Sequence, residues 1–509
     1  MLLDRDAAEI GAMAEALRPE TRAFIDGEYR TGSLGESFTT ENPATGEAIA
    51  KVVLCTGEDV DAAVTSARTA FEDGRWSGRS PRDRGRVLLR LAELIDEHRE
   101  ELALLECLDT GKPIRDAYTA DITKSAAMTR WYAEAADKLY DEVAPTRPDV
   151  LAVVRREPLG VVGCVTPWNF PLYQAAYKLG PVLVSGNSLI IKPAEQTPLT
   201  TIRLAALALE AGVPPGVLNV VPGDGPITGA ALGRHPDVDC LAFTGSTATA
   251  RRFLAYSAES NAKKVCVEAG GKSPHIVFPD AGDLDEVAEA VVWGIFYHQG
   301  QVCSAGSRLF VHRAIAGELL DRVVLLAEAL RVGDPLDPGT QVGALISDRQ
   351  RRRVMDYIER GRAEGARLLT GGHGTRAGTG GHFIAPTVFD QVRNDMTIAR
   401  EEIFGPVLAV LPFDDIDEVV RLANDTAYGL GAGLWTRDID LALGVAARLR
   451  AGQVWVNNYD GSDWSVPWGG FKQSGTARDK SLHAIDEYTA PKATWIQTRP
   501  PAPFTLVTR

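Results

Sequence analysis

The feature that most constrains the fold is an alternation of short apolar runs with amphipathic segments, beginning near Leu159. Helical periodicity fills 199–211 and 249–258, between the runs. The apolar runs cover 161–165, 188–191, 217–221, 240–243 and 265–267. Strands that alternate with helices are typical of a parallel, doubly wound sheet, which binds ligands at the carboxyl ends of its strands. The sequence therefore predicts an α/β fold with its site at that edge.

A second α/β block is expected over 270–471. Its expected strands are 275–278, 308–312, 407–413 and 454–457. An apolar stripe at helix spacing over 284–296 predicts a helix, with Asp283 as its N-cap and Gly300 as its stop. Cys303 is then expected just beyond a helix end, on a tight loop.

The length, net charge and residue counts of the chain argue against several classes of protein. At 509 residues the chain is expected to form two or three domains, and its net charge of −14 argues against a general nucleic-acid surface. The six cysteines include no Cys-x-x-Cys pair and the eight histidines no metal-ligand spacing, so neither a disulfide framework nor a catalytic metal is expected. The sequence contains no apolar run of about 18 residues and no signal-peptide pattern, which predicts a cytoplasmic protein without a membrane partner.

Cys303 is the residue with the clearest chemical potential. It lies in a loop of small residues, 300–308, while Glu268 stands beside two glycines in 267–274. A thiolate attacks carbonyl groups, and a carboxylate beside glycines has room to swing and to carry a proton. In a reducing compartment Cys303 stays a free thiol. Together the two residues indicate covalent chemistry on a carbonyl.

Asn169 lies between two prolines in 167–171, directly after the first strand of the predicted sheet. An Asn amide at the carboxyl end of a strand is placed to stabilise a developing oxyanion. The alternative interpretation is a turn built by the two prolines, in which the amide satisfies a backbone group.

Three further segments carry groups that suit a dinucleotide; the first two lie at the ends of strands, and the third lies before a strand. Lys192 and Glu195 suit ribose hydroxyls, and because an acid disfavours a 2′-phosphate, NAD is expected rather than NADP. Segment 243–247 ends a strand and opens a helix, where free N–H groups hold a pyrophosphate. Glu402 and Phe404 combine a carboxylate for a ribose with an aromatic side chain. The structural alternatives are, for the three segments in turn, an exposed loop, a plain Ser/Thr helix cap, and a strand start with a core Phe.

Seven segments, in order along the chain, resemble the motifs of the aldehyde dehydrogenase superfamily. They are 167–171, 192–198, 243–247, 268–274, 300–308, 402–407 and 467–475. The resemblance extends from about Phe24 to Gln497. It implies that Cys303 is the nucleophile and Glu268 the general base. It also implies an oxyanion hole made by Asn169 and the Cys303 N–H.

The same resemblance implies supporting residues. Lys178 is expected to support the active-site network. The residues expected to contact the coenzyme are Thr166, Pro167, Trp168, Lys192, Glu195, Gly225, Gly229, Phe243, Gly245, Ser246, Glu402 and Phe404. Gly225 and Gly229 belong to a glycine pattern that departs from G-x-G-x-x-G.

The closing segment 475–484, with the Trp495-Ile496 pair beyond it, resembles the gamma-glutamyl-gamma-aminobutyraldehyde dehydrogenase branch. Segments 131–135 and 457–460 are similar to that branch too. The sequence departs from the family pattern at Trp468, where Phe is usual, and at Ala269, where Leu is usual. These departures bear on the substrate and leave the reaction unchanged.

The resemblance also implies how the chain divides. We expect a Rossmann-like coenzyme domain from 1–140, which is expected to be mostly helical, and 157–269. A catalytic domain is expected over 270–471, and β-arms for oligomerisation over 141–156 and 472–509. Residues 494–497 look like a strand with nothing local to pair with, so pairing across subunits of a homodimer or homotetramer is expected.

The substrate pocket is expected to combine aromatic rings with acids. Its expected members are Asp121, Tyr173, Tyr177, Phe296, Tyr459, Asp460, Asp463, Trp464 and Trp468. Tyr and Trp faces hold cationic amines, and carboxylates attract them. The hypothesis is a short amino- or glutamylamino-aldehyde as substrate; core aromatics and surface acids are the alternative.

Three rival functions remain. A CoA-acylating enzyme of the same superfamily releases the thioester with CoA instead of water, and Glu268 argues against it. A binding or structural homologue without catalysis does not need Cys303, Glu268 and Asn169 together. A thiol hydrolase that pairs His298 with Cys303 leaves the nucleotide motifs unexplained.

Overall fold

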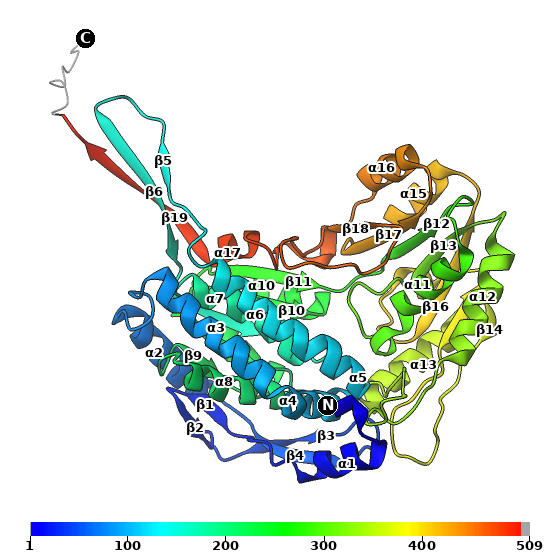
Figure 1. Cartoon of the computed structure of the whole chain (residues 1–509), viewed down its shortest axis with the longest axis horizontal. Coiled ribbons are helices and arrows are strands. Elements are labelled where there is room, and N and C mark those ends of the chain that lie inside the picture. Colours follow the sequence, from blue (N-terminus) through cyan, green and yellow to red (C-terminus); the bar gives the residue numbers. More distant parts are fainter. Residues whose placement is uncertain (1, 500–509) are drawn as a thin grey trace.

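The chain forms two seven-stranded sheets and a projecting three-stranded arm, in a computed structural model that describes residues 2–499 (Figure 1). In the first sheet, five parallel strands are extended by an antiparallel pair. Its spatial order is β11 (Lys264–Ala269), β10 (Cys240–Gly245), β7 (Val161–Val165), β8 (Ser188–Lys192), β9 (Leu218–Val220), β1 (Ala23–Ile25) and β2 (Glu28–Arg30).

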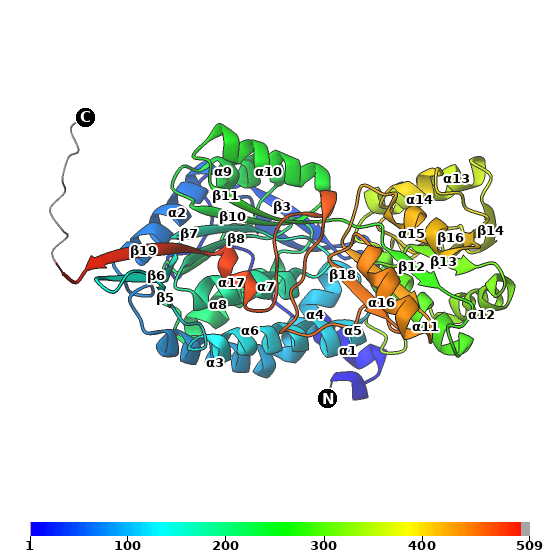
Figure 2. The ribbon, with the colours of Figure 1, turned by 90° about the horizontal axis from the view of Figure 1, so that it is seen from above.

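Helices cover both faces of this first sheet, as Figure 2 shows. Alternate residues of β7 face opposite ways: Val161 and Val165 pack in one apolar cluster, Val162 and Cys164 in another. Burial on both faces explains why the strand reads as an unbroken apolar run. One face carries α2 (Gly57–Glu72), α9 (Ala230–Arg234) and α10 (Thr247–Glu259); the other carries α7 (Pro171–Val184), α8 (Leu199–Ala211), α3 (Pro81–Glu97) and α6 (Thr123–Ala135).

The second sheet is parallel except for its edge strand β14. Its order is β14 (Arg367–Thr370), β15 (Thr387–Asp390), β16 (Val407–Phe413), β13 (Arg308–His312), β12 (Pro274–Val277), β17 (Gly431–Trp435) and β18 (Gln453–Val456). One face packs α11 (Leu284–Phe296) and α12 (Ala316–Ala329). The other packs α13 (Asp348–Ala363), α15 (Ile416–Asn424) and α16 (Ile439–Arg448).

The arm corrects the expectation for the C-terminal strand. β19 (Thr489–Gln497) pairs antiparallel with β6 (Val150–Pro158) of the same chain, and β5 (Glu142–Ala144) pairs on the other side of β6. The partner of β19 therefore lies in the same chain and not in another subunit, although it is distant in sequence. Residues 500–509 of the expected arm 472–509 lie outside the described residues.

The N-terminal part is less helical than expected, because it also contains four strands. β1 and β2 extend the first sheet, and β3 (Ser37–Glu41) pairs with β4 (Ala48–Val53) in a ribbon of their own. The remaining helices are α1 (Ala7–Ala16), α4 (Arg99–Thr110), α5 (Ile114–Asp116), α14 (Thr397–Arg400) and α17 (His483–Glu487). Over residues 2–499, no helix is both long and apolar enough to cross a membrane.

The predicted doubly wound fold is confirmed, and most predicted strands match within a few residues. Asp283 caps α11 as expected, its side chain accepting from the Asp285 N–H. The helix ends at Phe296, however, and a 3-10 turn over 297–300 follows, with His298 and Gln299 at positive φ. The division into domains at the predicted boundaries stays a prediction.

Candidate active site

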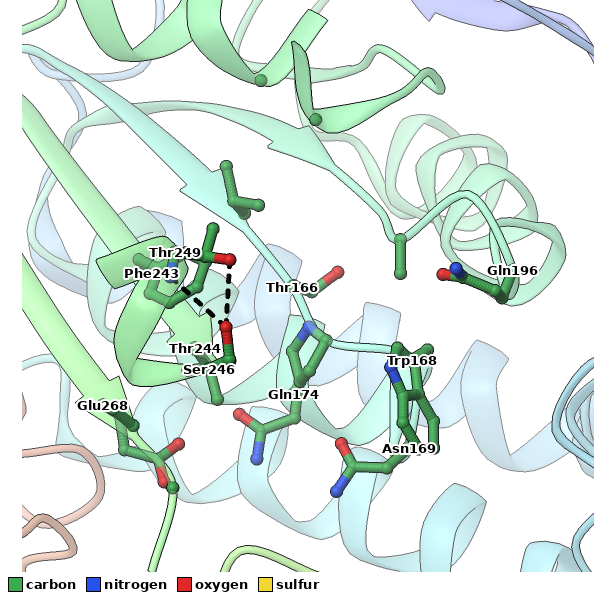
Figure 3. A pocket seen from close by; sticks show the side chains of 18 of the residues that line it. Thr166, Trp168, Asn169, Gln174, Gln196, Phe243, Thr244, Ser246, Thr249 and Glu268 are labelled. Carbon is green, nitrogen blue, oxygen red and sulfur yellow. Dashed lines mark hydrogen bonds between the residues drawn. The ribbon is translucent and has the colours of Figure 1, made fainter. Parts of the chain in front are cut away.

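A cavity of about 510 Å³ lies at the carboxyl ends of β7, β8, β10 and β11, where it also meets the second sheet (Figure 3). Cys303, Glu268 and Asn169 line it together with every residue that the sequence assigned to the coenzyme. Those twelve are Thr166, Pro167, Trp168, Lys192, Glu195, Gly225, Gly229, Phe243, Gly245, Ser246, Glu402 and Phe404. Parallel strands bring them together, because their carboxyl ends share one edge.

Several buried polar atoms of this cavity have no hydrogen-bond partner among residues 2–499. They include the hydroxyls of Thr166 and Thr244 and the amide oxygen of Gln174. At the start of α10, the Ser246 side chain accepts a hydrogen bond from the Thr249 N–H at 3.3 Å, as the dashed lines in Figure 3 show. Unpaired buried polar groups are costly, and a helix N-terminus favours an anion. The cavity therefore fits a polar ligand with phosphate groups.

Lys192 reaches into the cavity from the end of β8. Its ammonium donates to the Pro193 carbonyl at 2.9 Å and lies 3.8 Å from the Glu195 carboxylate. Burial lowers the pKa of Lys192, and Glu195 opposes this effect. The pair thus offers one donor and one acceptor to hydroxyl groups.

Glu402 is held by the glycines that follow β11. The Gly271 N–H donates to its carboxylate at 3.0 Å. A Cβ at Gly270 would overlap that carboxylate, so only glycine permits the approach. Burial raises the pKa of Glu402 to about 7. The ring of Phe404 meets Trp168 edge-on at 5.1 Å.

Cys303 lies partly exposed on the turn that follows α11 and the 3-10 segment. Gly271 packs so closely below it that a Cβ there would overlap the Cys303 carbonyl oxygen. The Tyr459 hydroxyl donates to the Ser304 carbonyl at 2.7 Å and supports the turn. Within residues 2–499 the Cys303 backbone N–H has no hydrogen-bond acceptor, so it is free to bind one.

Asn169 is fixed from two directions. Its side-chain N–H donates to the Gln301 carbonyl at 2.8 Å, and its own carbonyl accepts from Lys112 at 3.0 Å. Lys112 is fully buried and ion-paired with Asp121. The expectation that Asp121 attracts a substrate amine is therefore wrong, because Lys112 already offsets its charge.

Glu268 is buried, and both of its carboxylate oxygens lack a well-aligned partner. Burial raises its pKa to about 7, the charge of Asp479 adds to this, and Lys178 opposes it. Cys303 and Trp468 lie close enough to lower the pKa of Glu268 a little without making an aligned hydrogen bond. The carboxyl group is thus tuned to exchange a proton near neutral pH.

Lys178, which the resemblance assigned to the active-site network, lies close enough to lower the pKa of Glu268, but its direct partner is Asp479. The two atoms of that ion pair are 2.5 Å apart, and both side chains are buried. Asp479 was missed because it belongs to the closing segment, whose return to the active site has no signal in local periodicity. Trp468 pairs with Asp479 through backbone hydrogen bonds.

The Cys303 thiol is protonated in its present surroundings. Burial raises its pKa well above the ordinary value, and the neighbouring charge of Glu268 raises it further. A proton acceptor is therefore needed before the sulfur attacks, and Glu268 is the nearest one. His298 does not bond to Cys303; its ring lies against Phe170 at 5.0 Å, and burial lowers its pKa.

The expected aromatic residues divide into two groups. Tyr173 meets Tyr177 at 4.7 Å and Trp464 at 6.3 Å, and Trp468 lies near Glu268. These four rings surround one side of the site. Within that group lies the ammonium of Lys480, which the sequence reading did not single out.

Phe296 and Tyr459 lie outside this group of rings and both line a separate cavity of about 790 Å³, so their placement in the substrate channel stays a prediction. Phe296 packs in the apolar cluster between α11 and the second sheet, because α11 ends there and the chain turns. Tyr297, one residue on, takes the position facing Phe170, at 6.3 Å. Tyr459 stacks on His275 at 4.4 Å.

The two remaining acids of the prediction lie near the channel mouth. The Asp460 carboxylate accepts from the Ser304 hydroxyl at 3.2 Å, and burial raises its pKa. Asp463 is exposed and accepts from the Ser465 N–H at 2.8 Å. Cavity residues without a role assigned from the sequence include Gln174, Gln196, Thr249, Arg252, Arg349, Gln350 and Arg353.

A two-sheet α/β protein with a thiol, a carboxylate and an amide at the end of such a cavity defines a narrow class. The family model described as "Aldehyde dehydrogenase family" matches residues 29–494. The chain therefore belongs to the aldehyde dehydrogenase family.

Three similar proteins show which members of the family this chain resembles. The aminoacetaldehyde dehydrogenase of Pseudomonas aeruginosa is 50% identical and covers 97% of this chain and 99% of its own length. The solved gamma-glutamyl-gamma-aminobutyraldehyde dehydrogenase of Burkholderia cenocepacia is 52% identical, with a TM-score of 0.96 over 97% of this chain and 100% of that one. The AldA indole-3-acetaldehyde dehydrogenase of P. syringae, a mutant solved in complex with NAD+, is 51% identical, with a TM-score of 0.96 and the same coverage.

Proposed function

We propose that this protein oxidises an aldehyde to its carboxylic acid with NAD+, through a thioester on Cys303. The observation that carries the proposal is the position of the Cys303 thiol beside the buried Glu268 carboxylate, at the end of a cavity that fits a dinucleotide. The P. syringae relative was solved with NAD+, which supports the coenzyme.

The first step is attack by sulfur on the aldehyde carbon. Glu268 accepts the thiol proton, a C–S bond forms, and the carbonyl π electrons move onto oxygen. The free Cys303 N–H and the Asn169 amide then donate to that oxygen. Buried, fixed donors stabilise the oxyanion, because they need no reorganisation as charge develops.

The oxidation follows when the oxyanion re-forms a carbonyl and the aldehyde hydrogen departs with its electron pair. Bound NAD+ supplies the acceptor for this hydride. Lys192 and Glu195 lie where they would hold one ribose, and Glu402 where it would hold the other. The acid at Glu195 favours NAD+ over NADP+, since a 2′-phosphate would be repelled.

Hydrolysis completes the cycle. Glu268 first releases the thiol proton to solvent. It then removes a proton from water as the water oxygen attacks the thioester carbon. The C–S bond breaks, the carboxylic acid leaves, and the sulfur regains its proton. A carboxyl group with a pKa near 7 is both a competent base and readily regenerated at neutral pH.

We propose a short aldehyde with an amino or glutamylamino end as substrate. The aromatic side of the site supports this class, as do the substrates in the names of the P. aeruginosa and B. cenocepacia relatives. Comparing kcat/KM for 4-aminobutyraldehyde, its glutamylamino derivative and equally long neutral aldehydes tests it. No preference for either nitrogen-bearing aldehyde over the neutral ones would contradict it.

Two alternatives have distinct signatures. A CoA-acylating enzyme makes no product until CoA is added, whereas the proposed enzyme makes acid without it. A catalytically silent homologue shows no NADH absorbance with any aldehyde.

The direct test of the proposed function is Cys303→Ala. Wild-type protein with NAD+ and aldehyde should produce NADH and take up a thiol reagent at Cys303. The variant should lose oxidation while it still binds NAD+, as followed by protein fluorescence. Undiminished oxidation by the variant would overturn the mechanism.

We further propose a homodimer or homotetramer in the cytoplasm. The arm exposes large apolar side chains, namely Tyr140, Val143, Leu151, Trp495 and Ile496. Exposed apolar patches of this kind mark association surfaces. A reducing compartment keeps Cys303 as a thiol.

A further inference from the structure

A lysine of the protein itself occupies the aromatic group beside the active site. The ammonium of Lys480 lies 5.1 Å from the ring centre of Trp468, 5.3 Å from Tyr177 and 5.9 Å from Trp464. The side chain is only 2% exposed. The rings that were expected to receive a substrate amine therefore already face a cation.

The backbone holds Lys480 in this place at some cost. Lys480 and Ser481 have φ values of 57° and 50°, in the left-handed region that side-chain-bearing residues avoid. The residue before Lys480, Asp479, is anchored by two backbone hydrogen bonds with Trp468, each 2.6 Å long. Strained conformations persist where the surroundings over-determine them, and they gather at functional sites.

The Lys480 ammonium has no counter-ion. Within residues 2–499 its hydrogen-bond partner is the Ser462 hydroxyl, and no carboxylate lies within ion-pair distance. A buried cation without a partner is unfavourable, so the site has room for an anion.

The acids near Lys480 are otherwise engaged. Asp479 is paired with Lys178, and Asp460 accepts from the Ser304 hydroxyl. The charges that reach Lys480 include those of Asp460 and Asp479, which raise its pKa, and of Lys124, which lowers it. Asp463, which faces the same cavity, accepts from the Ser465 N–H and hydroxyl. Burial lowers the pKa of Lys480 to about 8, a value that still leaves the amine mostly charged at neutral pH.

Trp468 connects the Lys480 ammonium to the reacting residues, because it lies near both Glu268 and Lys480. Its indole lies close enough to Glu268 to affect the pKa of that carboxyl, and its ring meets the Lys480 ammonium. Lys480 and Trp468 also line a cavity of about 320 Å³ with Ser462 and Asp463. Because Trp468 contacts both Glu268 and Lys480, a substrate that extends from Cys303 along this indole reaches the Lys480 ammonium.

We propose that Lys480 binds a carboxylate at the far end of the substrate, so that the preferred aldehydes are those with a distal carboxylate. The inference rests on the proposed function and chooses within it. A glutamylamino-aldehyde carries such a carboxylate, whereas a simple aminoaldehyde presents an ammonium that Lys480 repels. The Lys480 ammonium suits a carboxylate, and the surrounding aromatic rings suit the extended chain that carries it.

The test compares substrates in matched pairs. Aldehydes of increasing chain length, each with a terminal carboxylate, a neutral hydroxyl or an ammonium, are assayed with wild type, Lys480→Met and Lys480→Arg. Wild type should prefer the carboxylate. A charge-assisted hydrogen bond corresponds to about a 10- to 100-fold preference. Lys480→Met should remove most of that preference, mainly through KM, and Lys480→Arg should retain part of it.

The control substitution is Lys51→Met, at an exposed lysine of β4, which should leave the preference unchanged. Thermal melting shows whether each variant folds. An unchanged carboxylate-to-neutral ratio in folded Lys480→Met, or a wild-type preference for the ammonium, would overturn the inference. Wild-type oxidation of the neutral aldehydes shows independently whether the proposed function holds.

Discussion

At the scale of single residues, Glu268 connects the surroundings of the site to its chemistry. Burial and, to a lesser extent, the charge of Asp479 raise its pKa to about 7, against the opposing charge of Lys178. A base must be deprotonated to accept a proton from water. The rate is therefore expected to fall as the pH drops through about 7.

The pH profile of kcat/KM should show this acidic limb, and Asp479→Asn should move it to lower pH. The substitution removes a negative charge that raises the pKa of Glu268 and leaves the positive Lys178 in place. The measurement is the initial rate of NADH formation over a pH series. Asp395→Asn, at an exposed carboxylate, is the control and should not move the limb. An unmoved limb in Asp479→Asn would count against the assignment.

Asn169 gives a second prediction at this scale. Asn169→Ala should lower kcat by about 10²–10³-fold, the usual loss when one oxyanion donor is removed. The measurement is single-turnover NADH formation, which isolates the chemical step from coenzyme release. A loss that appears only in KM would show that Asn169 positions substrate without stabilising the oxyanion.

At the scale of elements, the two glycines after β11 allow Glu402 and the Cys303 turn to pack closely against this segment. A Cβ at Gly271 would overlap the Cys303 carbonyl oxygen, so Gly271→Ala should displace the Cys303 turn. A displacement of about 1 Å costs roughly 10²-fold in rate. Gly444→Ala is the matched control, since nothing lies within 4 Å of its Cβ position in α16.

The two glycine variants are compared by kcat and by thermal melting. Gly444→Ala should keep its activity and gain about 0.5–1 kcal/mol in stability, because alanine is the better helix former. Normal activity in Gly271→Ala would show that the turn tolerates the shift.

The elements also show how far sequence reading reaches. The runs at 161–165, 308–312 and 407–413 became strands with those same bounds, because burial on both faces leaves a continuous apolar signal. The end of α11 was misplaced by four residues, since Gly300 looks like a stop but the chain leaves the helix at Phe296. After this earlier end, Tyr297 faces Phe170, whereas Phe296 packs against the second sheet.

The candidate site likewise contains residues that the sequence predicted and residues that it did not. The residues at strand ends were predictable, because the fold itself brings them to one edge. Asp479 and Lys480 were not assigned, since they come from an irregular closing segment whose path back to Glu268 depends on tertiary contacts. Asp121 was misjudged because its partner, Lys112, has no motif that marks it.

At the scale of the whole molecule, the arm of β5, β6 and β19 stands away from the two sheets (Figure 1). Its exposed Trp495 is expected to lie in a subunit interface. Trp495→Lys should lower the mass in sedimentation equilibrium while circular dichroism stays unchanged. Ile439→Lys, at a similarly exposed apolar residue of α16, should keep the mass. An unchanged mass in Trp495→Lys would place the interface elsewhere.

The central claim is that the substrate is held covalently on Cys303 between oxidation and hydrolysis. Glu268→Gln tests it most directly, because it removes the base for hydrolysis together with a charge that raises the pKa of the thiol. Mixed with NAD+ and aldehyde at alkaline pH, where solvent hydroxide takes the thiol proton in place of Glu268, this variant should form about one NADH per subunit and then stall. Intact-mass spectrometry should find the acyl group, and peptide mapping should place it on Cys303. Continued full turnover with no mass increase would contradict the account.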